Sequence, residues 1–347
     1  MKQYIIYTCI FIFFPLNCIS GNNNMKDIEI DLRSHVFKIS SMPSINELKL
    51  IEINNYINLV FSSKQGSYRK LYTIPFKNNT SSPELLLQLP EFPLEYQEWD
   101  IFMKSDNFFD IVYTAGINFN SLRYQTKLKR HSKLKTENEY YVNKKYSYQN
   151  FIQPKLIKNN NAEISFISAI IKSENKSQLV LFSLNEKNND YQKIIDCESG
   201  ILIKQKEGYI LCYKLNIPGP ARKTPWSKSG VLNCVYLDSQ FKLINKSLFQ
   251  PLSNICIYDF DVFMFKDYLF ITASCEAGLY FVVVKKIEKT FKLLNLIVKQ
   301  SETVLCCPAI YSKNEKIFIA LIEYNKKNIP EILTGTILHN TIINQKQ

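Results

Sequence analysis

The chain has 347 residues, a formal net charge of +12 and nine cysteines. A chain of this length would usually form two domains, and its excess of lysine would suit an anionic partner. We nevertheless expect no nucleic-acid partner, because the first residues are typical of an exported protein.

Residues 1–20 are predicted to be a secretory signal peptide that is cut after Ser20. They carry one lysine and a long apolar and aromatic run, and the polar segment GNNN follows them. An uncleaved membrane anchor is disfavoured by Pro15, and a lipoprotein acylated at Cys18 is disfavoured by Asn17, which stands where a small residue is expected. We therefore expect a secreted protein without a transmembrane anchor, located outside the cell, in a secretory organelle or in a bacterial periplasm.

The remaining residues, 21–347, repeat one pattern. Each copy has a short apolar strand, a polar turn, a second strand that ends in small residues, another polar turn and a third strand. The interval between copies is close to the length of one four-stranded propeller blade. The six copies begin near residues 47, 98, 153, 199, 259 and 306.

This repeat predicts an all-β protein with a single domain, a six-bladed β-propeller. Each unit can bury one face only against its neighbours, so the units should stack into a closed ring. Residues 27–40 should form an extra strand that pairs in the last blade and leaves no exposed edge there. The alternative is a generic all-β protein, such as two sandwiches, whose hairpins merely look alike.

Two segments combine cations with aromatic residues, the composition that anchors protein interfaces. The basic stretch, residues 127–148, is either a binding surface or a solvated outer strand; the loop 216–230 is either a binding loop or a loop whose tryptophan caps the blade. The candidate partner-binding residues are Arg130 and Lys133, beside Tyr140 and Tyr141, in the stretch, and Arg222, Lys223, Trp226 and Lys228 in the loop.

Seven cysteines remain after the signal peptide, all in the second half of the chain. No C-x-x-C spacing occurs among them, which disfavours zinc, and an exported protein retains disulfides. We expect one bridge between Cys256 and Cys275, across a turn at residues 266–267. A second bridge should join Cys197 to Cys212, for which Cys234 competes. No unique partner is predicted for Cys306 and Cys307.

The sequence carries no recognised catalytic or cofactor motif. G-x-S-x-G, H-E-x-x-H, G-x-G-x-x-G and P-loop patterns are missing, and so are the S-x-D-x-G-x-x-W turns of sialidase-like propellers. Trp99 and Trp226 are the only tryptophans, so a W-D dipeptide does not recur in each copy as it does in WD40 propellers. A sialidase needs three arginines around the substrate carboxylate, and nothing marks three of the five arginines as convergent. The carboxylates at predicted strand ends are Asp100, Asp110, Asp259 and Asp261, which are more typical of turns than of a glycosidase site.

The chain resembles the family of the cysteine-rich protective antigen of malaria parasites. The similar stretches are RSHVFKISSMPSINELKLIEINNYINLVFS and CCPAIYSKNEKIFIALIEYNKKNIPEIL, together with the repeat, the leader and the clustered cysteines. The resemblance implies a secreted, sialidase-like propeller without catalytic machinery that bridges other secreted proteins during host-cell entry. The cysteines depart from the family, because the first three copies have none.

We therefore expect a non-enzymatic adaptor without a cofactor or metal, whose partners are other secreted or surface proteins. A carbohydrate-active enzyme or a glycan-binding protein is the alternative.

Overall fold

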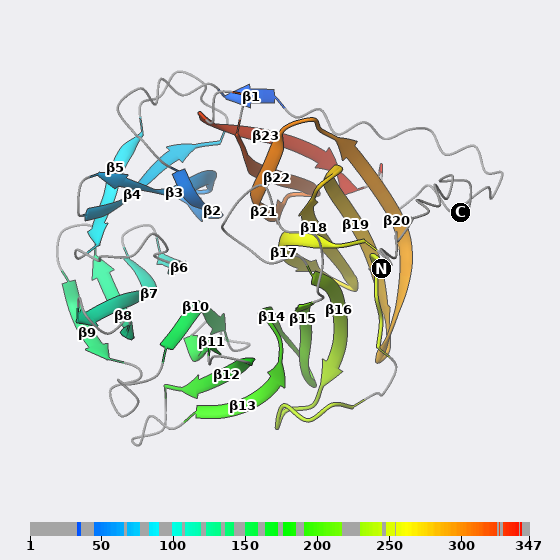
Figure 1. Ribbon diagram of the computed structural model, residues 1–347, viewed down its shortest axis with the longest axis horizontal. Helices are drawn as coiled ribbons and strands as arrows, with labels where there is room; N and C mark the ends of the chain where they lie inside the picture. Colours follow the sequence, from blue (N-terminus) through cyan, green and yellow to red (C-terminus); the bar gives the residue numbers. More distant parts are fainter. Residues whose placement is uncertain are drawn as a thin grey trace, which may run out of the picture.

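The computed structural model describes an all-β protein, as predicted (Figure 1). Among its described residues, no helix is long and apolar enough to cross a membrane. Residues 1–20, which the sequence predicts to be a signal peptide, lie outside the described part of the chain, as do Lys133 and residues 217–229. The latter include the candidate residues Arg222, Lys223, Trp226 and Lys228. The described residues are 33–35, 45–65, 68–76, 83–89, 99–105, 108–118, 123–132, 136–141, 150–158, 164–172, 176–184, 191–216, 230–244, 248–253, 255–324, 326, 329–339 and 341.

The first half of the chain folds into three antiparallel four-stranded sheets, each made of strands consecutive in the sequence. A two-residue turn at Asn54 and Asn55 joins the first two strands of the first sheet. The first sheet comprises β2 (Ile45–Ile53), β3 (Tyr56–Gln65), β4 (Tyr68–Pro75) and β5 (Glu84–Leu89); the second comprises β6 (Trp99–Ser105), β7 (Phe108–Asn118), β8 (Arg123–Ser132) and β9 (Thr136–Tyr141); the third comprises β10 (Asn150–Lys158), β11 (Ile164–Lys172), β12 (Ser177–Ser183) and β13 (Tyr191–Asp196).

The next seven strands form one sheet that contains two repeat copies. A single residue pair, Gly230 with Ile257, joins the two halves. A further segment, residues 243–249, adds to the first half through the bridges Leu237 to Leu243 and Cys234 to Phe249. The strands are β14 (Ser199–Gln205), β15 (Gly208–Asn216), β16 (Gly230–Leu237), β17 (Ile257–Phe265), β18 (Tyr268–Cys275), β19 (Gly278–Ile287) and β20 (Thr290–Gln300).

The last sheet combines the two ends of the described chain. β1 (Arg33–His35) pairs antiparallel with β23 (Pro330–Leu338), next to β22 (Lys316–Tyr324) and β21 (Val304–Lys313). Arg33–His35 thus pair in the last sheet, where the sequence predicted a strand over residues 27–40 to pair. The rest of that predicted strand lies outside the described residues. The division of residues 21–347 into one domain of six blades stays a prediction.

The sheets lie around a common centre, toward which β2, β6, β10, β14, β17 and β21 are turned (Figure 1). Each of these strands contacts the corresponding strand of the next sheet, and β21 contacts β2. The first and last sheets therefore meet in space although they are far apart in the sequence.

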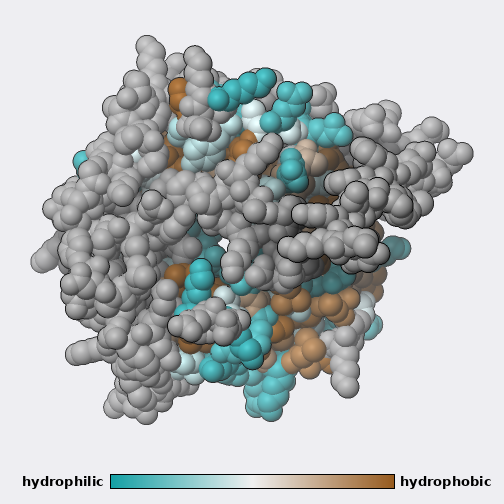
Figure 2. Space-filling model, in the orientation of Figure 1, coloured by the Kyte–Doolittle hydropathy of each residue, from teal (hydrophilic) through white to brown (hydrophobic). Residues whose placement is uncertain are grey.

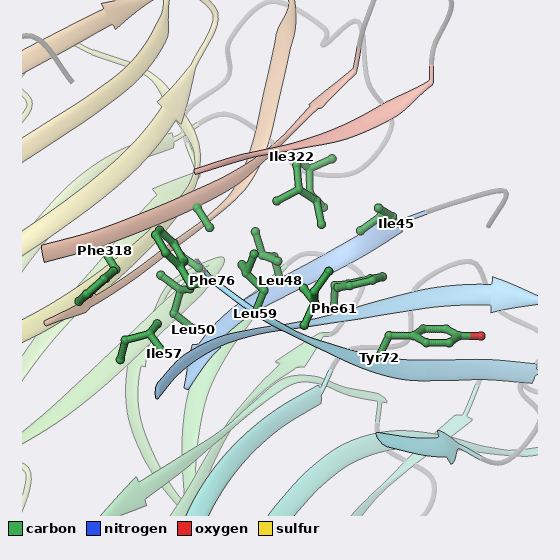
Figure 3. Close-up of a cluster of buried hydrophobic side chains, with 14 of the residues drawn as sticks. Ile45, Leu48, Leu50, Ile57, Leu59, Phe61, Tyr72, Phe76, Phe318 and Ile322 are labelled. Atoms are coloured by element: carbon green, nitrogen blue, oxygen red, sulfur yellow. The ribbon is translucent and has the colours of Figure 1, made fainter. Parts of the chain in front are cut away.

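Apolar side chains fill the space between neighbouring sheets. Figure 3 shows the cluster between the first and last sheets, to which Leu48, Leu59, Phe76, Phe318 and Ile322 belong. Similar clusters lie between every other pair of neighbouring strand groups. Burial of these faces supplies the main favourable free energy of folding, because each sheet alone would leave them in water.

Polar contacts reinforce the junction of the first and last sheets. Lys313 Nζ lies 2.6 Å from Glu52 Oε1, and the Tyr311 hydroxyl donates to Glu52 Oε2 at 3.4 Å. The Tyr324 hydroxyl donates to the carbonyl of Ile45 at 2.9 Å. Burial, followed by the charge of Glu52, raises the pKa of Tyr311 to about 12, so this phenol stays protonated as a donor.

Candidate functional site

The candidate site is the common centre of the sheets, because one strand of each strand group lies there beside the corresponding strand of the next. Carboxylates on the central strands accept hydrogen bonds from backbone N–H groups of the next sheet. Glu47 on β2 accepts from Trp99 N at 3.1 Å, and Asp100 on β6 accepts from Leu156 N at 2.9 Å. In the same way Asp261 on β17 accepts from Ile310 N on β21, at 3.0 Å.

These three contacts have a structural role. Backbone N–H groups on the edge strand of a sheet would otherwise lack partners at the centre, and a charged acceptor makes the stronger kind of hydrogen bond. Glu52, also on β2, is held by Lys313 and Tyr311. These hydrogen bonds and the ion pair therefore engage four of the five carboxylates that the six central strands carry, Glu47, Glu52, Asp100 and Asp261. The fifth carboxylate is Asp259.

Lys49 on β2 supplies a positive charge beside these carboxylates. Its Nζ lies 3.5 Å from Asp100 Oδ1, and its side chain is 18% exposed. Burial would lower the pKa of Lys49, but the carboxylates of Asp100 and Asp261 outweigh burial and hold that pKa above its usual range. The ammonium is therefore charged at neutral pH and balances the carboxylates, which makes it a poor nucleophile or base.

The remaining acidic candidates from the sequence lie in two different places. Asp110 is buried on β7, the second strand of its sheet. Asp259 lies on β17, where its backbone N–H bonds to the Ser274 hydroxyl at 3.3 Å. Asp100, Asp259 and Asp261 thus share the central strands, and Asp110 does not.

The described arginines lie away from the centre. Arg33 is on β1, Arg69 is on β4, and Arg123 and Arg130 are on β8. These strands are the third or outer ones of their sheets. Within the described part of the chain, no arginine comes from a strand turned to the centre, where three would have to converge on a carboxylate substrate.

The basic stretch occupies the outer part of the second sheet. Arg130 lies on β8 opposite Asp110 on one side and Asn138 of β9 on the other, and Tyr140 lies opposite Leu128. β9 is the outermost strand of this sheet. This position fits both readings of the sequence, a binding surface and an outer strand, and the interface role stays a prediction.

No disulfide is formed among the described cysteines. Ile257, not its neighbour Cys256, lies opposite Cys275, and Cys256 is exposed whereas Cys275 is buried. Successive residues of an extended chain point to opposite faces, so the register directs the side chain of Ile257, and not that of Cys256, to the face of Cys275. The expected bridge between Cys256 and Cys275 is not formed here. It remains a prediction, which this register does not favour.

The other predicted bridge is not formed either. Cys197 packs in the cluster between the third sheet and β14–β16, whereas Cys212 packs in the cluster on the opposite side of those strands. Burial raises the pKa of the Cys197 thiol to about 12, so it stays protonated. The sequence offered Cys234 as the alternative partner of Cys212, and the structure places Cys234 beside Cys212.

No metal site is found among the described residues, in that no three side chains of His, Cys, Asp or Glu gather within reach of one ion. His339 is buried, and its Nε2 lies 2.7 Å from the Ser312 hydroxyl. The contact with Ser312 gives the His339 imidazole a structural role, without a metal ion.

Sequence reasoning missed two features. Glu47 and Lys49 were not singled out, although an acidic residue near the start of the strand in the first, second and fifth copies was a detectable signal. An exposed apolar edge was missed as well. Figure 2 shows hydrophobic residues gathered at the lower right, in the region of β16, β19 and β20. Its exposed apolar side chains are Leu243, Leu248, Ile287, Leu293 and Val298.

No family model and no curated protein matches the chain. Among solved structures, it is similar to the Trypanosoma rangeli sialidase, with a TM-score of 0.58, 8% identity, and coverage of 88% of this chain and 56% of the sialidase. The same enzyme in complex with sialic acid gives a TM-score of 0.57 at 8% identity, covering 88% and 55% of the two chains. A mutant of it displaying trans-sialidase activity gives 0.52 at 7% identity, covering 87% and 55%.

This likeness shows a sialidase-like fold. The chain spans about half the length of the sialidase chains it matches.

Proposed function

We propose that the protein is a secreted, non-enzymatic binding propeller that acts as an adaptor between other secreted or surface proteins. Its six strand groups would be six blades of one closed ring, with β1 as the closing strand. The contacts between the first and last sheets support this ring, as does the likeness to sialidases.

The observation that carries the proposal is the use of the central carboxylates. Glycoside hydrolysis needs a pair of carboxyl groups free to donate a proton and to attack or activate water. Here Glu47, Asp100 and Asp261 accept backbone N–H groups from the next sheet. A carboxylate that holds two sheets together would have to give up that contact before it could act on a substrate, which would leave the backbone N–H group without its acceptor.

The outer edge offers a surface for a partner. β20 is the last strand of its sheet, and stacking of Phe249 on Phe291, with ring centroids 5.6 Å apart, holds segment 243–249 against it. The exposed apolar residues on these two segments, Leu248 and Leu293 among them, are typical of interface cores. The loop 216–230, which follows β15, and the basic stretch are the other candidate surfaces.

A carbohydrate-active or glycan-binding protein is the second candidate, and the sialidase-like fold favours it. The relationship to the malaria-parasite antigen family, export through residues 1–20 and a role in host-cell invasion belong to the same proposal. They rest on the sequence stretches described above.

A test for hydrolysis of glycoside substrates distinguishes the adaptor from a carbohydrate-active enzyme. The purified protein should release no more product from fluorogenic sialosides, arabinans or fructans than buffer does. Asp261→Asn should lower the thermal midpoint, because the acceptor of Ile310 N is weakened, and should leave this background unchanged. Turnover that a single Asp or Glu substitution abolishes would show an enzyme instead.

Binding is tested by quantitative capture from the native cell with matched variants. Leu248→Asp with Leu293→Asp should reduce the recovered partner at least tenfold if the apolar edge is the interface, and the exposed Tyr56→Ser, on the first sheet, should not. Trp226→Ala with Arg222→Ala, and charge reversal across Lys127 to Lys135, test the other two surfaces. Unchanged recovery with all three sets would refute these surfaces.

A further inference from the structure

Cys212 and Cys234 form a pair that lies apart from the central carboxylates and from the exposed edge. They lie directly opposite each other on β15 and β16, and both are fully buried. Their Sγ atoms are 3.2 Å apart. Two sulfur atoms at this distance need to approach by only about 1.2 Å to reach bonding length.

The backbone around Cys234 favours a covalent bridge. Its N–H donates to Phe249 O at 2.8 Å, and its carbonyl accepts from Phe249 N at 3.2 Å. Both groups therefore point away from β15, so Cys212 and Cys234 form a non-hydrogen-bonded pair. The Cα atoms of such a pair lie about 4.5 Å apart, which is within the range of about 4.4–6.8 Å that a disulfide spans.

The rival partners of Cys212 are less well placed. Ile201 is its neighbour on the other adjacent strand, β14. Cys197 belongs to the hydrophobic cluster on the opposite side of these strands. Cys275 lies on β18, opposite Ile257. Among the described cysteines, Cys234 is the one whose sulfur meets that of Cys212.

We propose that Cys212 and Cys234 are joined by a disulfide in the mature protein, formed while the chain folds. The oxidant is a disulfide of the glutathione or protein-oxidoreductase class. The Cys212 thiolate attacks one sulfur of that disulfide and displaces the other as a thiolate. The Cys234 thiolate then attacks Cys212 Sγ, which releases the second thiolate; two protons leave the cysteines, and the oxidant becomes a dithiol.

Burial determines when this exchange takes place. In the folded protein neither sulfur is accessible, and burial, followed by the contact with Cys212, raises the pKa of Cys234. Since the thiolate is the reacting form, oxidation precedes closure of the cluster between β14–β16 and β17–β20. Once formed, the bridge is protected from reductants by the same burial.

The bridge fixes the base of the loop 216–230, which leaves β15 and returns on β16. A disulfide there restricts the unfolded chain between the two cysteines and so stabilises the native state. This assignment does not depend on what the protein binds.

The test is peptide mapping of the full chain. The reduced protein is unfolded, refolded by dilution into reduced and oxidised glutathione, denatured again, alkylated and digested with trypsin without reduction. Cleavage after lysine separates the relevant cysteines, because Cys212 lies in peptide 207–214, Cys234 in peptide 229–242 and Cys197 in peptide 194–204. We expect most of peptide 207–214 to be recovered linked to peptide 229–242.

Recovery of both peptides alkylated, or a link between 194–204 and 207–214, would overturn the proposal. A second measurement begins with the wild type and then compares cysteine variants. The urea midpoint of the oxidised wild type should fall when a reductant is added under denaturing conditions. Cys275→Ser should keep this fall, whereas Cys212→Ser with Cys234→Ser should lose it.

Discussion

At the residue scale, His339 is a buried polar side chain whose protonation should affect the stability of the fold. Its ring packs on Phe265 and Phe270, and Nε2 contacts the Ser312 hydroxyl. Burial lowers the pKa of this imidazole, with the charge of Lys266 acting in the same direction and Glu315 opposing it.

The lowered pKa predicts a loss of stability in acid. The unfolded chain, with a histidine pKa of about 6.5, takes up the proton more readily than the folded one. Stability should therefore fall as the pH drops below about 6.5, until the lowered folded pKa is passed. Thermal midpoints at pH 7.5 and 5.5 check this, and His339→Gln should show a smaller decrease than the wild type. Equal decreases would assign the acid sensitivity to other groups.

At the element scale, two hairpins depend on glycine. Gly278 begins β19 after the turn at Glu276 and Ala277, with φ of 135°. A Cβ there would lie 2.1 Å from the backbone oxygen of Lys299. Gly208 begins β15 with the same φ, and its Cβ would lie 2.1 Å from the oxygen of Leu237. Both positions therefore need a residue without a side chain, because an L-residue meets neighbouring backbone and a disfavoured φ.

Gly278→Ala should destabilise the protein by more than about 1 kcal/mol. The urea midpoint of unfolding measures this effect. Gly200→Ala is the matched control, since its Cβ would meet a leucine side chain, Leu179 Cδ2, at 3.2 Å, and a side chain can move. If the two variants unfold at the same urea concentration, the close approach at Gly278 does not limit stability.

At the scale of the whole molecule, stability depends on contacts between sheets that are far apart in the sequence. Phe318 on the last sheet meets Phe76 of the first sheet edge to face, with ring centroids 5.1 Å apart. Each strand group shares a hydrophobic cluster with both of its neighbours. We therefore expect the sheets to unfold together.

Phe318→Ala should cost about 3–5 kcal/mol, the usual loss for a buried phenylalanine, and unfolding should remain a single transition. Tryptophan fluorescence, which includes buried Trp99, and far-UV circular dichroism should give coincident curves. The partly buried Phe291, changed to alanine, should cost less. Early loss of one signal in the variant would indicate that the last sheet unfolds by itself.

The sequence by itself determined the strands. Alternating and continuous apolar runs separated by polar turns predicted the all-β class, and the hairpin at residues 267–284 has its strands and its turn where the pattern indicated them. This success is local: a strand and its hairpin partner are close in the sequence, so side-chain period and turn residues specify them.

Only the tertiary structure decided which distant residues meet. Two kinds of contact illustrate this. How the sheets stack decides that Lys49 meets Asp100 and that Asp261 accepts from Ile310 N. The register of two neighbouring strands decides that Cys212 lies beside Cys234. A register shift of one residue reverses the face of every side chain, and the bulge between Ile257 and Phe260 is such a shift. For that reason the cysteine pairing could not be read from spacing, while the fold class could.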